Sequence, residues 1–189
     1  MSFPNAADWQ IFDAHGRRKY LNNAEREAVL AEADHCDAVT RALCYVLAYT
    51  GCRVSEALEL SPLWLDTELV SITLRSLKRR RITYRRVPVP DHVMAMLLAV
   101  PRTQEGRLFP MHRTTAWRQV DMLMQRAGVI GPMATCRGFR HGYGIHAISS
   151  GVPPTLLKRL MGHADIATTL IYVDAVGADE RRLVARMWN

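Results

Sequence analysis

The segment from residue 69 to residue 90 limits the possible folds most, because the spacing of its apolar side chains differs from that of its neighbours. In residues 22–33 and 38–51, apolar side chains recur at helical spacing. From residue 69 the period shortens to two, first in LVSITLRS and then in TYRRVPVP, which is typical of two strands. We therefore expect a small antiparallel hairpin in a chain that is otherwise mainly helical.

The remaining sequence predicts further helices around this hairpin. A third helix is expected to begin at Arg53, a fourth is capped by Asp91, and Thr114 or Thr115 opens a fifth. The C-terminal third holds three or four short helical segments. The predicted fold class is therefore mainly α with a small antiparallel β-sheet (α+β). A length of 189 residues suits one domain of this kind and is marginal for two.

Positive charge is concentrated in one stretch, RSLKRRRITYRR, which carries seven basic residues and no acidic one. The basic residues elsewhere equal the 18 acidic residues in number, so this stretch accounts for the whole net charge of +7. Such a local excess indicates a polyanionic partner, and DNA is favoured because each neutralised phosphate releases counterions. An anionic membrane surface is less favoured, since no amphipathic helix carries the charges. The residues expected to contact DNA are Arg75, Arg79, Arg80, Arg81, Arg85 and Arg86.

Composition argues against several other classes of protein. No apolar run approaches the roughly 18 residues of a membrane span, and the first residues, MSFPNAADWQ, lack the features of a secretion signal. The four cysteines show no C-x-x-C pairing, which favours buried reduced thiols over a disulfide framework or a metal site. We expect a cytoplasmic, nucleoid-associated protein.

Three short motifs place polar side chains at predicted junctions between helices. TGCRVSEALEL puts Arg53 two residues after a helix-ending glycine. CRGFRHGYGIHAISSG puts Arg137, Arg140 and His141 ahead of an apolar helix face. LMGHADIATTLIY has a histidine after a turn glycine and ends on Tyr172. Any one of these residues alone would be an ordinary surface or capping residue, so the set is what indicates a function.

In order, spacing and local sequence, these motifs resemble those of the tyrosine recombinases, the phage integrase family. The resemblance runs from about Tyr20 to the C-terminus. It implies the fold of a tyrosine recombinase catalytic domain, with residues 1–20 as an N-terminal arm and residues 21–189 as a single catalytic domain. Family members usually carry a separate N-terminal domain that binds the other face of DNA, and we expect none here.

The resemblance also implies roles for individual residues. Arg53 and Arg140 are similar to the two catalytic arginines, and His163 to the histidine that bonds the scissile phosphate. Tyr172 is similar to the nucleophile. Their chemistry suits this assignment, because planar guanidiniums match phosphate oxygens and a tyrosine oxygen can form a covalent phosphodiester.

Two positions leave alternatives open. Lys78 resembles the hairpin lysine that protonates the leaving oxygen, but Arg79 or Arg80 could occupy that position instead. Arg137 stands where the family usually has histidine or lysine. A guanidinium there suits phosphate binding better than proton transfer, because it hardly deprotonates near neutral pH. His141 is expected to support the catalytic residues rather than to act on DNA.

The activity implied is site-specific recombination of the integrase, invertase or resolvase type. DNA is cleaved and rejoined through a 3′-phosphotyrosyl intermediate, with no metal and no cofactor. The implied partners are double-stranded DNA with paired sites, three further copies in a tetramer on DNA, and accessory DNA-binding proteins.

Two other functions fit part of the pattern. A non-catalytic helix-turn-helix protein could present Thr168, Thr169 and Tyr172 to a DNA groove. That interpretation leaves Arg53 and Arg140 without a role. A DNA-relaxing enzyme of the type IB topoisomerase kind would use the same residues without needing paired sites.

Overall fold

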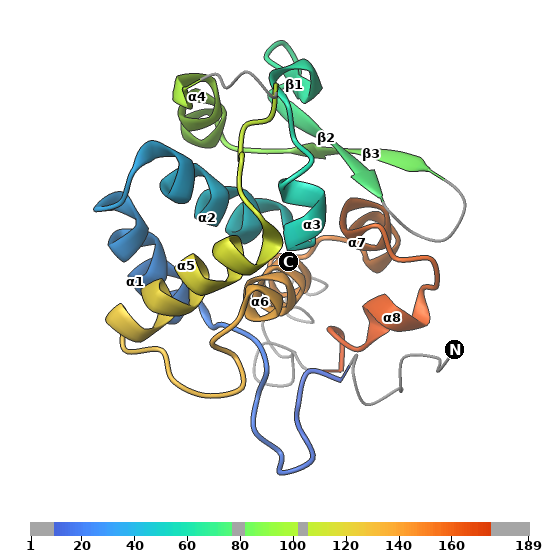
Figure 1. Cartoon of the computed structure of the whole chain (residues 1–189). Helices are drawn as coiled ribbons and strands as arrows, with labels where there is room; N and C mark the ends of the chain where they lie inside the picture. Colours follow the sequence, from blue (N-terminus) through green and yellow to red (C-terminus); the bar gives the residue numbers. More distant parts are fainter. Residues whose placement is uncertain (1–9, 77–81, 102–105, 175–189) are drawn as a thin grey trace, which may run out of the picture.

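Helices and one small sheet make up the computed structural model, which describes residues 10–76, 82–101 and 106–174. Three antiparallel strands accompany the helices (Figure 1), which confirms the predicted α+β class. No helix in the described part of the chain is both long and apolar enough to cross a membrane.

The first two helices begin and end at residues that the sequence marks clearly. Helix α1 (Asn23–Asp34) starts at a capping box in which Asn22 and Glu25 bond each other's backbone N–H groups. Helix α2 (Ala38–Thr50) is capped by the Asp37 carboxylate. Most of α2 is buried, and it packs on α1, α4 and α6. It therefore forms the centre of the larger hydrophobic core.

The remaining helices pack around this centre, and α6 lies between α1, α2 and α5 on one side and α7 and α8 on the other (Figure 1). His112, rather than Thr114 or Thr115, caps α5, because its Nδ1 accepts a hydrogen bond from the Thr114 N–H at 3.4 Å. Asp91 is the first residue of α4 and follows the cap residue Pro90. The bounds are α3 (Val54–Ala57), η2 (Pro62–Trp64), α4 (Asp91–Ala99), α5 (Arg113–Arg126), α6 (Cys136–Ser149), α7 (Pro154–Met161) and α8 (Ala167–Leu170).

The sheet has the strand order β1-β2-β3 and is antiparallel throughout. The predicted strands are β2 (Ser71–Ser76) and β3 (Thr83–Pro88), while β1 (Leu65–Asp66) was not predicted because two residues show no period. Register places Leu74 opposite Arg85. Side chains on alternate residues face opposite sides of a strand, so Arg85 shares the inner face with buried Val87.

Residues 10–20, which were expected to be an arm, pack on the domain. Ile11 is buried in a small apolar cluster with Leu157, Met161 and Tyr172. Arg18 pairs with Glu25 of α1. These contacts hold the segment beside α6, where the candidate site lies.

Candidate active site

Arg53 lies at the junction between α2 and α3. Gly51 ends α2 in the left-handed conformation (φ 58°), and Arg53 then becomes the N-cap of α3. Glu56 accepts hydrogen bonds from the Arg53 N–H at 2.9 Å and from Nη1 at 3.0 Å. The buried Nη2 of Arg53 has no hydrogen-bond partner among the described residues. Arg53 is therefore fixed by Glu56 and keeps one donor available for an anion.

Arg140 projects from α6 and is anchored to two other segments. Its Nη1 donates to the Gly51 carbonyl at 2.6 Å, and its Nη2 donates to the Met161 carbonyl at 2.9 Å. Burial, with the neighbouring Arg53 charge, lowers the pKa of Arg140 to about 10. Arg140 therefore stays positively charged at neutral pH.

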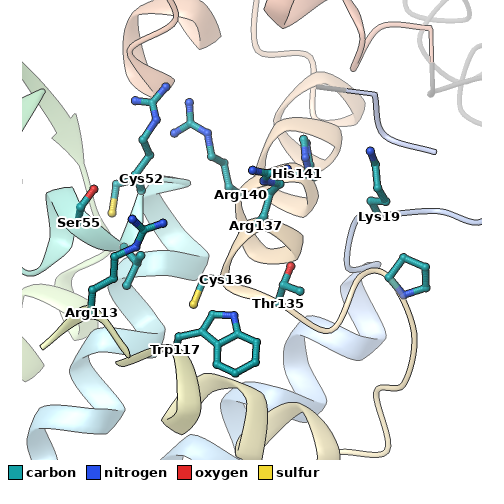
Figure 2. Close-up of a pocket in the computed structure, with 13 residues that line it drawn as sticks. Lys19, Cys52, Ser55, Arg113, Trp117, Thr135, Cys136, Arg137, Arg140 and His141 are labelled. Carbon is teal, nitrogen blue, oxygen red and sulfur yellow. The ribbon is translucent and has the colours of Figure 1, made fainter. Parts of the chain in front are cut away.

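A cavity of about 430 Å³ brings the arginines of two motifs together. Arg53 and Arg140 line it, and so does Arg137, whose side chain is exposed. Figure 2 shows Arg137 and Arg140 projecting from α6, with side chains from other segments around them. The additional lining residues that no sequence motif had marked include Lys19, Arg113 and Trp117. A concave surface lined by several guanidiniums suits an anionic ligand such as a phosphodiester.

Tyr172 lies next to this cavity but is buried, with 1% of its surface exposed. Its hydroxyl shares a hydrogen bond of 3.2 Å with Nδ1 of His141, a residue that also lines the cavity. The ring packs on α6 at Gly144, where a Cβ would lie 2.6 Å from it. Burial raises the pKa of Tyr172 to about 12, although two nearby guanidiniums act in the opposite direction. The hydroxyl is therefore protonated and shielded from solvent.

His163 lies in the turn after α7, on the other side of the Tyr172 ring. Gly162 ends α7 in the left-handed conformation (φ 65°), and His163 follows it. The Nδ1 of His163 lies 2.8 Å from the Thr169 hydroxyl oxygen. The rings of His163 and Tyr172 stack with centroids 6.2 Å apart. The turn therefore places His163 beside the Tyr172 ring, while its predicted bond to the scissile phosphate stays a prediction.

The ends of the two hairpin strands lie at a second hollow beside the site. His163 lines this hollow together with Ser76 and Thr83, which end β2 and begin β3. The segment that joins these two strands carries Lys78 and three arginines, Arg79, Arg80 and Arg81. These four residues lie outside the described residues, so their assignments stay predictions.

The described arginines of the hairpin divide into two groups. Arg75 and Arg86 point outward, within 3.9 Å and 3.6 Å of Glu59 and Asp66 respectively. Arg85 differs from the expectation of a DNA contact, because only 8% of it is exposed. The alternation of the strand turns Arg85 inward, where it is bound by protein groups. Arg75 and Arg86 remain available for DNA, and Arg85 does not.

Comparison with known proteins identifies the family of this chain. The sequence profile of the phage integrase family matches residues 19–177. This chain belongs to the phage integrase family. It is 28% identical to the tyrosine recombinase XerD of Pseudomonas putida, over 89% of this chain and 61% of that protein. It is 26% identical to a resolvase of Escherichia coli, over 85% of this chain and 75% of the resolvase. The chain spans about 60% of the length of XerD.

Solved structures of the same family have the same fold. The XerA recombinase superposes with a TM-score of 0.77 at 25% identity, over 89% of this chain and 64% of XerA. The catalytic domain of bacteriophage HP1 integrase has a TM-score of 0.63 at 24% identity, over 86% of this chain and 95% of that domain. These matches confirm the tyrosine recombinase catalytic-domain fold that the sequence predicted.

Burial argues against the helix-turn-helix interpretation for this integrase-family chain. Thr169 has no exposed surface and bonds His163, while Tyr172 is packed between two histidines. In this conformation, these side chains are not accessible to a DNA groove. In the part of the chain that the structure describes, no three His, Cys, Asp or Glu side chains form a group that could hold a metal ion.

Acid is expected to destabilise the fold through His141. Burial, followed by the charge of Arg140, lowers the pKa of His141 from 6.5 to about 3. As the pH falls below 6.5 the unfolded chain takes up a proton that the folded chain does not, so stability present at neutral pH is lost. We expect the free energy of unfolding to fall by about 2 kcal/mol between pH 7 and pH 5 from this group alone.

Urea unfolding of His141→Gln at the two pH values tests this expectation, since the variant should lack that part of the fall. His15→Gln, which changes an exposed histidine, is the matched control and should keep it. An equal fall in His141→Gln and the parent protein would show that His141 does not cause the acid sensitivity.

Proposed function

We propose that this chain is a site-specific DNA recombinase that cleaves and rejoins double-stranded DNA through a covalent phosphotyrosyl intermediate at Tyr172. One observation carries the proposal. Arg53, Arg137 and Arg140 converge on one cavity, and a residue of that cavity, His141, bonds the Tyr172 hydroxyl at 3.2 Å. A phosphate bound by the arginines would therefore lie close to a nucleophile.

In the proposed reaction, the Tyr172 oxygen attacks the phosphorus of a DNA phosphodiester. A bond forms between that oxygen and phosphorus, the bond to the 5′ oxygen breaks, and the DNA 3′ phosphate stays on the protein. Arg53 and Arg140 stabilise the negative charge that develops on the non-bridging oxygens. A 5′ hydroxyl from a second strand then attacks the phosphotyrosyl ester, which rejoins the DNA and frees Tyr172.

Each proton in this scheme needs a partner. Tyr172 gives its proton to a water molecule in the cavity as it attacks, and the leaving 5′ oxygen gains a proton from a protein side chain. We assign the second transfer to Lys78, because the strands on either side of it end beside His163 at the second hollow. His163 is assigned a hydrogen bond to the bound phosphate. Arg137 is assigned phosphate binding only, since a guanidinium keeps its proton.

The buried tyrosine must move before it can react. Its hydroxyl is bonded to His141 and its ring is enclosed by α6 and His163. Binding of DNA is therefore proposed to draw residues 171–174 away from α6, which brings the hydroxyl to the phosphate. Such a shift needs DNA to bind the open state more tightly than the closed one.

We assign the partners by chemistry and by analogy. Related structures show XerH recombinase bound to its difH substrate and the Tn1549 integrase bound to transposon right end DNA. By analogy, this chain would act on paired DNA sites as a tetramer with accessory proteins. Arg75 and Arg86, with the arginines between the two strands, would supply much of the affinity for phosphate.

A nicked suicide substrate tests the proposed function. The probe is a pool of duplexes tiling the DNA on both sides of the gene, each nicked just 3′ of the tested bond and labelled on the 5′ side of that bond. Cleavage releases the short fragment before the nick, which traps the protein on the labelled strand. We expect a covalent adduct that survives denaturation and digestion to a labelled peptide. No adduct on any duplex that the protein binds would overturn the proposal. Relaxation of supercoiled plasmid that lacks the trapped site would favour the topoisomerase alternative.

A further inference from the structure

Arg85 occupies a position from which it contacts two parts of the site. Its Nη2 lies 2.7 Å from Glu56 Oε2 and its Nη1 lies 3.2 Å from Oε1, which forms a two-pronged ion pair. Its Nε donates to the Leu160 carbonyl at 2.8 Å. These bonds join β3 to α3 and to the end of α7, which are far apart in the sequence.

Glu56 connects Arg85 to Arg53 through hydrogen bonds. The same two carboxylate oxygens that bind Arg85 also bind the backbone and the guanidinium of Arg53. Glu56 is 1% exposed, and burial acts to raise its pKa. The bonds and charges of Arg85 and Arg53 outweigh burial, so the pKa of Glu56 lies below its ordinary value. The carboxylate is therefore ionised between two arginines, and losing Arg85 would alter what holds Arg53.

The Leu160 contact leads to the His163 turn. The Arg85 guanidinium lies against Gly162, where a Cβ would come within 2.9 Å of its Nη1. Arg85 and His163 also line the same hollow. A buried ion pair is weak evidence for stability, because desolvation offsets much of its attraction. The specific effect of these bonds is geometric, since they fix the relative positions of three segments.

We propose that Arg85 is a positioning residue, which orients Arg53 through Glu56 and the His163 turn through the Leu160 carbonyl. The inference rests on the proposed function of the site. It also explains why one arginine of a basic hairpin points inward. The base of the hairpin then helps to assemble the phosphate site as well as carrying charge to DNA.

Arg85→Ala and Arg86→Ala form a matched pair, because adjacent arginines of one strand face opposite sides. We expect Arg85→Ala to lower the single-turnover cleavage rate roughly tenfold to a hundredfold, the scale of a displacement of about 1 Å at a reacting centre. Its DNA affinity and salt dependence should stay near those of the parent protein. Arg86→Ala should instead weaken binding and reduce the salt slope by about one unit, the effect of one lost phosphate contact.

Two further variants separate positioning from simple loss of stability. Arg85→Ala leaves the buried Glu56 carboxylate with one arginine fewer, which should lower the melting temperature. The double variant Arg85→Met/Glu56→Gln removes the buried charges of these two residues. It should restore the melting temperature without restoring the cleavage rate. In a double-mutant cycle, Arg53→Lys should reduce the effect of Arg85→Ala on cleavage without removing it, because the orientation of Arg53 is already lost and only that of the His163 turn remains to be lost.

The possible results separate the two proposals. Three results would each overturn the positioning role. Arg85→Ala would cleave at the parent rate, or the double variant Arg85→Met/Glu56→Gln would recover the rate together with its stability. The third result is full additivity of the effects of Arg85→Ala and Arg53→Lys. In those cases the parent protein still forms the adduct. If neither the parent nor Arg86→Ala forms an adduct on DNA that it binds, the proposed function fails and this inference fails with it.

Discussion

Tyr172→Phe is expected to abolish the covalent protein–DNA adduct while the protein still folds and binds DNA. Phenylalanine keeps the ring that stacks on His163 and packs at Gly144, and loses only the oxygen bonded to His141. The loss of one buried hydrogen bond costs about 1 kcal/mol, which a folded domain can tolerate. Since the substitution removes the attacking atom, cleavage should fall below detection rather than merely slow down.

No nearby side chain is expected to replace the tyrosine. Thr169 is buried and bonded to His163, and an aliphatic hydroxyl forms an alkoxide much less readily than tyrosine forms a phenolate. Tyr143 lies on α6, and burial raises its pKa as well. The nicked suicide substrate followed by peptide mapping distinguishes these residues.

The matched control is Tyr84→Phe, which removes the oxygen from an exposed tyrosine of β3. This variant should form the adduct at the parent rate. An adduct that persists in Tyr172→Phe, or a labelled peptide that contains Tyr143, would show that the nucleophile is assigned wrongly. Loss of DNA binding in Tyr172→Phe would instead mean that its hydroxyl is needed for the fold.

Features that depend on neighbouring residues can be predicted from the sequence. Asn22 and Asp37 cap the first two helices as side chains of this kind usually do. The change from helical spacing to a period of two located β2 and β3 closely. Gly162 has the left-handed backbone that its turn requires, and that turn brings His163 to Tyr172.

The inward orientation of Arg85 can also be predicted from the sequence, but the run of basic residues favours a role in DNA binding instead. In TYRRVPVP the alternation places Arg85 on the same face as Val87 and Val89, both of which are buried. The prediction that all of these arginines contact DNA depends on their charge and ignores the two-residue period of the strand. The period was the better guide, because a strand with one face in the core fixes the direction of every side chain.

Other features could not be predicted because they depend on contacts between distant segments. Lys19 and Trp117 line the cavity with Arg140, yet no local pattern connects the three. The burial of Tyr172 follows from its packing in one cluster with Ile11 and with apolar side chains of α6 and α7. A motif identifies a nucleophile by its neighbours, but it contains no information on whether the hydroxyl faces solvent.

Arg140→Lys is expected to lower cleavage by about a hundredfold or more, although it keeps a basic side chain at this position. The guanidinium of Arg140 spans two carbonyls, Gly51 at 2.6 Å and Met161 at 2.9 Å, while facing the cavity. A lysine has one nitrogen and cannot reach two carbonyls and a phosphate together. It also loses its charge more readily when buried. Removal of one transition-state donor typically costs a hundredfold to a thousandfold in other enzymes.

The effect should appear in the rate of cleavage more than in DNA affinity, because the variant keeps Arg75 and Arg86, to which we assign much of the affinity. Single-turnover cleavage and equilibrium binding, measured on the same duplex, separate the two quantities. Arg126→Lys, which changes an exposed arginine of α5, is the control and should match the parent in both. Arg140 bonds the carbonyls of Gly51 and Met161, which lie two residues before Arg53 and His163 respectively. Arg140→Lys should therefore also disturb the positions of Arg53 and His163. A rate within about threefold of the parent, a difference of less than 1 kcal/mol in the barrier, would mean that Arg140 ties segments together without contacting the phosphate.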